Sequence, residues 1–240
     1  MLEDAFEKYV SNYDLDNRDI KLKHNHSYRV MMLQEKYAKL LGFSEEDVEL
    51  ARVIGLLHDI GRFEQLRVYN TYDDGKSIDH ADYSCVQLFD KNEIQLFTQR
   101  KDWYPIIKFA IKNHNKRVLR TVKNERAMMH AKLIRDTDKL DILFLLGFLR
   151  ELNVSATDEK ITTRVFNDFM KHKVVGNKCV RNKNDEIVLK YSFVFDIFHD
   201  VCLEEFKKNY EYFSIVNNGN KQLDEIYKET IKFIEERLEK

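Results

Sequence analysis

The run Ala51-Arg52-Val53-Ile54-Gly55-Leu56-Leu57-His58-Asp59-Ile60-Gly61-Arg62 is the most apolar segment of its length in an otherwise polar chain. A helix that is apolar on nearly every face belongs inside a bundle. Near its end the run nevertheless carries an imidazole and a carboxylate, those of His58 and Asp59. Both groups are costly to desolvate unless something pairs with them. Histidine nitrogen and aspartate oxygen both suit divalent cations, so the run predicts a metal at the end of a buried helix.

The composition favours a helical protein without a strong charge. The chain has 240 residues, with 40 Lys and Arg against 41 Asp and Glu, one Pro and seven Gly. A near-neutral charge gives no basis for binding nucleic acid or an anionic membrane. So few turn residues suit long helices better than sandwiches or barrels. We therefore expect an all-α protein.

Cysteine usage and the amino-terminal sequence bear on the compartment. The three cysteines have no Cys-x-x-Cys spacing, which indicates a reducing compartment and no disulfide framework. The start of the chain does not read as a signal peptide, and no apolar run reaches membrane-spanning length. We expect a soluble cytoplasmic protein. The sequence does not determine its oligomeric state.

The apolar spacing predicts a central helix over 45–58, with Ser44 as its cap. Four further helices are expected around it, over 26–41, 80–90, 103–114 and 125–149. Asp79 is expected to cap the helix that begins at residue 80. The chain after Arg62 is expected to be irregular, with the turn signal Asp73-Asp74-Gly75, and to form a wall of the site.

The last third of the chain has a different pattern. Segments 179–181 and 187–191 flank Asn182-Lys183-Asn184-Asp185, which predicts a small two-stranded β-hairpin. Extra helices are expected on both sides of the hairpin. A boundary near residue 155 would separate a core of residues 1–155 from an extension, 156–240, packed on it.

The eight histidines differ in their context. A lone buried histidine is more often a hydrogen-bonded core residue than a metal ligand. This ordinary interpretation applies to His24, His130, His172 and His199. Taken singly, His26, His80 and His114 are ambiguous.

Three segments together resemble the HD superfamily of metal-dependent phosphohydrolases. They are His26-Ser27-Tyr28-Arg29-Val30, His58-Asp59-Ile60-Gly61 and Asp136-Thr137-Asp138-Lys139-Leu140-Asp141. The pattern of that family is a His, a His-Asp pair and a distant Asp on a helical core. The resemblance covers residues 24–142, and the segment after 155 has no counterpart in the common core.

The resemblance implies His26, His58, Asp59 and Asp138 as ligands of a first metal. Asp138 precedes Lys139-Leu140, where the family usually has a basic residue and Leu. Asp136 and Asp141 remain alternatives, of which only Asp141 could share the helix face of Asp138. Asp141 could then orient a ligand.

The resemblance leaves the number of ions open. In the binuclear branch of the superfamily, two histidines in the interval before the distal Asp bind a second ion, and the Asp of the pair bridges. His80 and His114 resemble those two. The alternative is that they are general acids or phosphate contacts around a single ion. Mn, Fe, Mg, Ni, Co and Zn are not distinguished.

The implied activity is hydrolysis of a phosphomonoester or phosphodiester, in a nucleotide or a similar small molecule. A divalent cation lowers the pKa of bound water and polarises a phosphoryl oxygen. Besides Asp59, the candidate catalytic residues are Arg62 and Lys139, each placed to contact phosphate. Solvated surface charge is the alternative for both.

Two other function classes remain. One is a binuclear-iron oxidase on the same scaffold. The other is a ligand-sensing module with an idle site, which is weakened because no ligand position of the pattern is missing. The chain has no basic stripe or aromatic platform that would indicate nucleic-acid binding.

Overall fold

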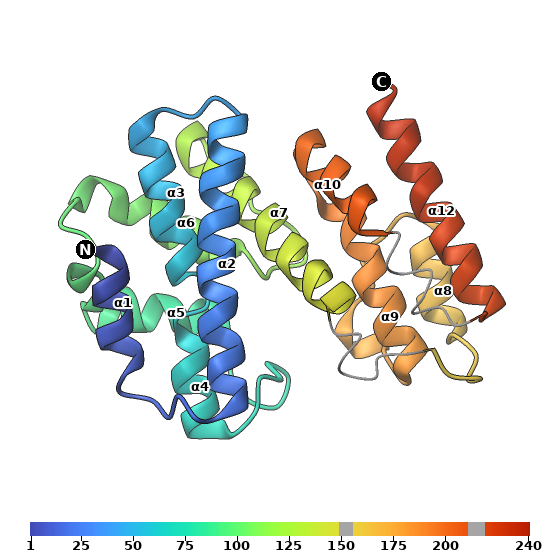
Figure 1. The fold of residues 1–240 in the computed structure, drawn as a ribbon, viewed down its shortest axis with the longest axis horizontal. Helices are drawn as coiled ribbons and strands as arrows, with labels where there is room; N and C mark the ends of the chain where they lie inside the picture. The colour runs from blue at the N-terminus through green and yellow to red at the C-terminus, as the bar shows by residue number, and fades with distance from the viewer. Residues whose placement is uncertain (149–155, 211–218) are drawn as a thin grey trace. The chain divides into compact units, whose positions relative to one another are not determined.

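The computed structural model describes residues 1–148, 156–210 and 219–240. Its contacts divide the chain into two compact units, Met1–Thr137 and Asp138–Lys240. Every regular element in the described ranges is helical, and these ranges contain no strand (Figure 1). The all-α class is therefore confirmed. The boundary expected near residue 155 lies outside the described residues.

The first unit is built from helices and short helical turns. In order these are α1 (Leu2–Val10), α2 (Arg18–Leu40), α3 (Glu45–Leu57), α4 (Gly61–Tyr69), α5 (His80–Cys85), the π-helical turn η1 (Val86–Asp90), the 3-10 turns η2 (Glu93–Leu96) and η3 (Lys101–Trp103), α6 (Tyr104–Asn113) and the beginning of α7 (Glu125–Phe148). None of the helices in the described part of the chain is long and apolar enough to cross a membrane.

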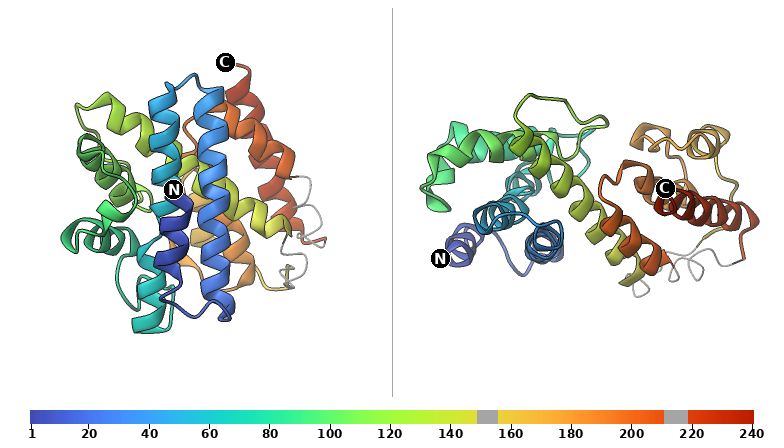
Figure 2. Two further views of the ribbon diagram at one scale, coloured as in Figure 1. Left: turned by 60° about the vertical axis from the view of Figure 1, so that its left-hand side comes forward. Right: turned by 90° about the horizontal axis from the view of Figure 1, so that it is seen from above.

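Helix α3 is the central helix expected from the apolar run. It packs against α2 and α6, and α2 runs alongside it in both Figure 1 and Figure 2. Gly55 makes the approach of α2 possible, because a Cβ atom there would lie 2.9 Å from the Cα atom of Met31. Leu50, Ile54 and Leu57 of α3 are completely buried in the core of this unit.

Polar caps begin the helices around the site. Ser44 Oγ accepts from the amide of Asp47 at 3.1 Å, and Asp79 Oδ1 accepts from the amides of Ala81 and Asp82. Both expected caps are confirmed. Helix α2, by contrast, begins at Arg18 instead of near residue 26, because the Asn17 side chain caps it there.

The expectation of an irregular chain directly after Arg62 is wrong. Helix α4 begins at Gly61 and continues to Tyr69, and only residues 58–60 separate it from α3. Gly61 does not end a helix. A Cβ atom at this position would lie 2.6 Å from the backbone nitrogen of Ser84, so glycine is required where α5 crosses the start of α4. Residues 70–79 are irregular.

The second unit contains the end of α7, α8 (Thr163–Met170), η5 (Asn177–Cys179), α9 (Lys183–Tyr191), η6 (Ser192–Asp196), α10 (Asp200–Tyr210) and α12 (Lys221–Leu238). The β-hairpin prediction is wrong, because α9 occupies residues 183–191. Asn182 caps α9 by accepting from the amide of Asp185 at 2.9 Å. The buried Asp185 carboxylate accepts in turn from the amides of Thr162 and Arg181. The polar run is therefore a helix start, not a hairpin turn.

Candidate metal centre

Four histidines and one aspartate converge in the interior of the first unit. His26 comes from α2, and His58 and Asp59 from the junction of α3 and α4. His80 is the first residue of α5, and His114 directly follows α6. All five are buried. They form two groups that share Asp59, and within each group one potential ligand atom per residue lies within 4.8 Å of the others.

The two carboxylate oxygens of Asp59 face different pairs of histidines. Oδ2 lies 3.6 Å from Nε2 of His26 and 3.7 Å from Nε2 of His58. Oδ1 lies 3.4 Å from Nε2 of His80 and 3.6 Å from Nε2 of His114. Asp59 therefore stands between the two pairs, with one oxygen directed to each.

Hydrogen bonds on the far side of the rings set their orientation. Nδ1 of His58 lies 2.7 Å from the carbonyl oxygen of Gly55, and Nδ1 of His114 lies 2.7 Å from that of Ile111. A carbonyl oxygen only accepts, so in both rings Nδ1 carries the hydrogen and a neutral ring keeps its lone pair on Nε2. Nε2 is also the atom that each ring presents to Asp59.

The orientation of His80 is set by a carboxylate. Its Nδ1 lies 2.6 Å from Oδ2 of Asp74. Burial lowers the pKa of His80 to about 4, although the bond to Asp74 opposes that shift. The ring is thus neutral near pH 7, and its Nε2 offers a lone pair to the interior.

Two observations show that the residues fit a cation. Nε2 of His80 and Nε2 of His114 lie only 3.1 Å apart. In both rings the hydrogen is on Nδ1, where it is donated to Asp74 or to the Ile111 carbonyl, so both Nε2 atoms carry lone pairs and neither can donate to the other. Oδ1 of Asp59 is buried and has no hydrogen-bond partner in the described structure. Acceptors that converge in a buried site are unfavourable without a positive charge between them. A divalent ion would satisfy all three atoms.

Lys23 is a member of the site that the sequence interpretation missed. Its Nζ lies 2.7 Å from Oδ2 of Asp59. Burial alone would raise the pKa of Asp59, but Lys23 and the surrounding histidines hold it well below its ordinary value. Lys23 precedes His26 by three residues, a spacing that shares one helix face. The sequence interpretation could not use this spacing, because the predicted helix, 26–41, begins after Lys23.

Arg62 joins α4 to the irregular segment that follows it. Its Nη1 donates to Oδ1 of Asp74 and to the carbonyl oxygen of Tyr72, each at 2.8 Å. Gln65 Nε2 donates to the same Asp74 oxygen at 3.1 Å. The segment is therefore tied to the site through Asp74, a residue noted in the sequence only as part of a turn. Phosphate binding by Arg62 stays a prediction.

Asp138 directly follows Thr137 in α7. It belongs to the second unit, and its role as a metal ligand stays a prediction, as do those of the alternatives Asp136 and Asp141. Nζ of Lys139 lies 2.8 Å from Oδ2 of Asp196 in the second unit, so this ammonium already has a counter-charge. Phosphate binding by Lys139 also stays a prediction.

Three of the four histidines given the ordinary interpretation have polar partners outside the metal centre. Each has a ring nitrogen within hydrogen-bond distance of a carboxylate outside the cluster. The pairs are His24 with Glu7, His130 with Asp47 and His172 with Glu229.

Comparison with known families identifies the family of the chain. The model of the HD domain matches residues 24–143, which is half of the chain. This chain belongs to the HD domain family. Members of the family are generally metal-dependent phosphohydrolases, and HD domains bind divalent metals. No curated protein and no solved structure matches the chain.

Proposed function

We propose that this HD domain protein hydrolyses a phosphate ester of a nucleotide or a similarly small molecule, using water activated by a divalent cation. The observation that carries the proposal is the position of Asp59, with one oxygen toward each of two histidine pairs. Family membership supports the same class of reaction.

The ligand atoms support a site for two ions. Oδ2 of Asp59 with His26 and His58 would hold one ion, and Oδ1 with His80 and His114 would hold the other. Asp138 is our candidate for the distal aspartate of the family's pattern. When bound, divalent ions would lower the pKa of water and polarise the phosphoryl group.

The remaining charges suggest how the chain would bind an anionic substrate. The Lys23 ammonium lies at the ligand set, and Asp59 is its one carboxylate partner among the residues that the structure describes. Nη1 of Arg62 is instead engaged by Asp74, Tyr72 and Gln65. Lys23 is therefore a further candidate for contact with a phosphate group, beside Lys139 and beside Arg62, whose buried Nε lies 3.8 Å from Oδ1 of Asp59.

The test combines elemental analysis with a phosphate-release screen. Protein purified without chelator is analysed for metal, loaded with each candidate ion, and assayed on nucleoside mono-, di- and triphosphates and on phosphodiesters. We expect bound metal and phosphate release, with Asp59→Asn inactive. Metal-loaded protein that releases no phosphate from any substrate would contradict the proposal. Oxygen consumption by the iron-loaded protein would favour the oxidase instead, and neither activity would favour an idle sensing module.

A second measurement tests the number of ions. We expect two equivalents of metal in the wild-type protein and one in His114→Ala. If His80 and His114 are general acids around one ion, the variant keeps its metal and loses about 10²–10⁴ in rate. A wild-type protein that holds one ion at saturation would refute the binuclear site and leave the hydrolase proposal standing.

A further inference from the structure

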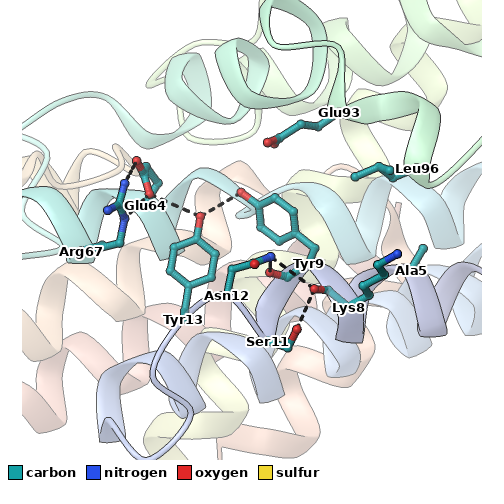
Figure 3. Close-up of a pocket in the computed structure, with 10 residues that line it drawn as sticks. All are labelled: Ala5, Lys8, Tyr9, Ser11, Asn12, Tyr13, Glu64, Arg67, Glu93 and Leu96. Carbon is teal, nitrogen blue, oxygen red and sulfur yellow. Dashed lines mark hydrogen bonds and ion pairs between the residues drawn. The ribbon is translucent and has the colours of Figure 1, made fainter.

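A cavity in the first unit shares no lining residue with the metal centre. It has a volume of about 720 Å³ and lies between α1, α4 and η2 (Figure 3). This volume is within the range of small-molecule sites in proteins. Its polar lining includes Lys8, Tyr9, Tyr13, Glu64, Arg67 and Glu93.

The hydrogen bonds in this cavity form a chain in which each donor points toward the Glu64 carboxylate. Arg67 donates through Nε and Nη2 to both carboxylate oxygens of Glu64, at 2.6 and 2.5 Å. The Tyr13 hydroxyl donates to Glu64 at 3.4 Å. The Tyr9 hydroxyl lies 3.2 Å from the Tyr13 oxygen and must be the donor to it, because the Tyr13 proton is already engaged. The lone pairs of the Tyr9 oxygen are therefore left as acceptors.

Glu93 adds a carboxylate from the other side of the cavity. Figure 3 shows it opposite α1, with its carboxylate turned toward the Tyr9 ring. Its Oε2 atom is buried and has no hydrogen-bond partner among the described residues. Burial raises the pKa of Glu93, and the charge of Glu64 raises it further while Lys91 opposes the shift. A buried acceptor without a donor costs free energy that a ligand could recover.

The lining favours a ligand group that donates hydrogen bonds and carries a positive charge. Glu93 and Tyr9 both present acceptors, whereas the Arg67 guanidinium is held in two bonds to Glu64. The rings of Tyr9 and Tyr13, with Ala5 and Leu96, provide apolar surface for a short carbon chain.

We propose that this cavity binds a small molecule that carries a primary ammonium group, which donates to Glu93 and to the Tyr9 oxygen. Such a ligand could be an alkylamine or an amino acid. The exposed Lys8 ammonium on the same lining would pair with the carboxylate of an amino acid but not with an alkylamine. The site is independent of the proposed phosphohydrolase activity.

The test is calorimetric titration of the full chain with three probes at millimolar concentration. They are n-butylammonium, norleucine and the uncharged 1-pentanol. We expect both ammonium compounds to bind and 1-pentanol not to bind. Tighter binding of norleucine than of n-butylammonium, lost in Lys8→Gln, would identify an amino acid as the ligand class. Equal or weaker binding of norleucine would identify an alkylamine.

Two near-isosteric variants test the residues. Glu93→Gln should weaken ammonium binding by tenfold or more, and Tyr9→Phe should weaken it to a smaller extent, while the exposed Glu45→Gln serves as the matched control. Thermal unfolding of each variant confirms that it is folded. The proposal would be overturned by any of three results. These are unchanged binding in Glu93→Gln, no binding of any ammonium probe, and loss of binding in an equal concentration of K⁺.

Discussion

Oδ2 of Asp74 lies 2.6 Å from Nδ1 of His80, and this contact directs the opposite ring nitrogen of His80 toward Asp59. Arg62 and Gln65 of α4 hold the other oxygen of Asp74. A carboxylate behind a histidine fixes the ring and raises its basicity as a metal ligand. The irregular segment after α4 thus acts on the metal site without contributing a ligand.

We therefore expect Asp74→Asn to weaken metal binding by about 10–100-fold, because the amide accepts from His80 less strongly than the carboxylate does. Titration of chelator-treated protein with Mn²⁺ or Zn²⁺ measures the change. The neighbouring Asp73→Asn is the matched control, since the Asp73 carboxylate instead accepts from the amide of Gly75 and pairs with Lys76. Equal affinity in the two variants would show that Asp74 only supports the fold of its segment.

Asp59→Ala should abolish metal binding, because it removes an oxygen from both histidine pairs at once. Elemental analysis of the purified variant provides the measurement. A variant that loses activity but keeps its full metal content would show that Asp59 acts on the substrate and not as a ligand.

His26→Ala should also reduce bound metal, whereas His24→Ala should leave metal content unchanged. Nε2 of His26 faces Oδ2 of Asp59, but the His24 ring contacts Glu7. The two histidines are on the same helix, two positions apart, so they form a matched pair for elemental analysis. Loss of metal in His24→Ala alone would mean that the ligand at the start of the pattern has been assigned to the wrong histidine.

Gly61→Ala should lower the free energy of unfolding by about 1–3 kcal/mol, the usual range for overpacking. The added Cβ would lie 2.6 Å from the backbone nitrogen of Ser84, which cannot yield without moving α5. Gly176→Ala is the control, because nothing lies within 4 Å of a Cβ at that position. Urea unfolding followed by circular dichroism compares the two, and equal midpoints would contradict the close packing of α4 and α5.

Local sequence signals were sufficient to predict the all-α class and most of the helices of the first unit. The apolar run predicts α3, and the caps Ser44 and Asp79 predict where α3 and α5 begin, because capping depends on contacts within one turn. The same kind of signal misled at Asn182, whose polar neighbours suit a turn as well as a helix start. Burial of Asp185 against the Thr162 amide stabilises the helical alternative, and that contact is not local.

The sequence by itself also indicated which residues could bind a metal, through the resemblance of His26, His58-Asp59 and Asp138 to the pattern of the HD superfamily. Only the tertiary structure decided that the two oxygens of Asp59 face separate histidine pairs, and that Lys23 and Asp74 belong to the site. The contacts of Lys23, His26 and His80 with Asp59, and of Asp74 with His80, join residues that are 6 to 36 positions apart in the chain. The physical reason is that they depend on how α2, α4, α5 and α6 pack around α3, and packing is set by side chains on all of these helices together.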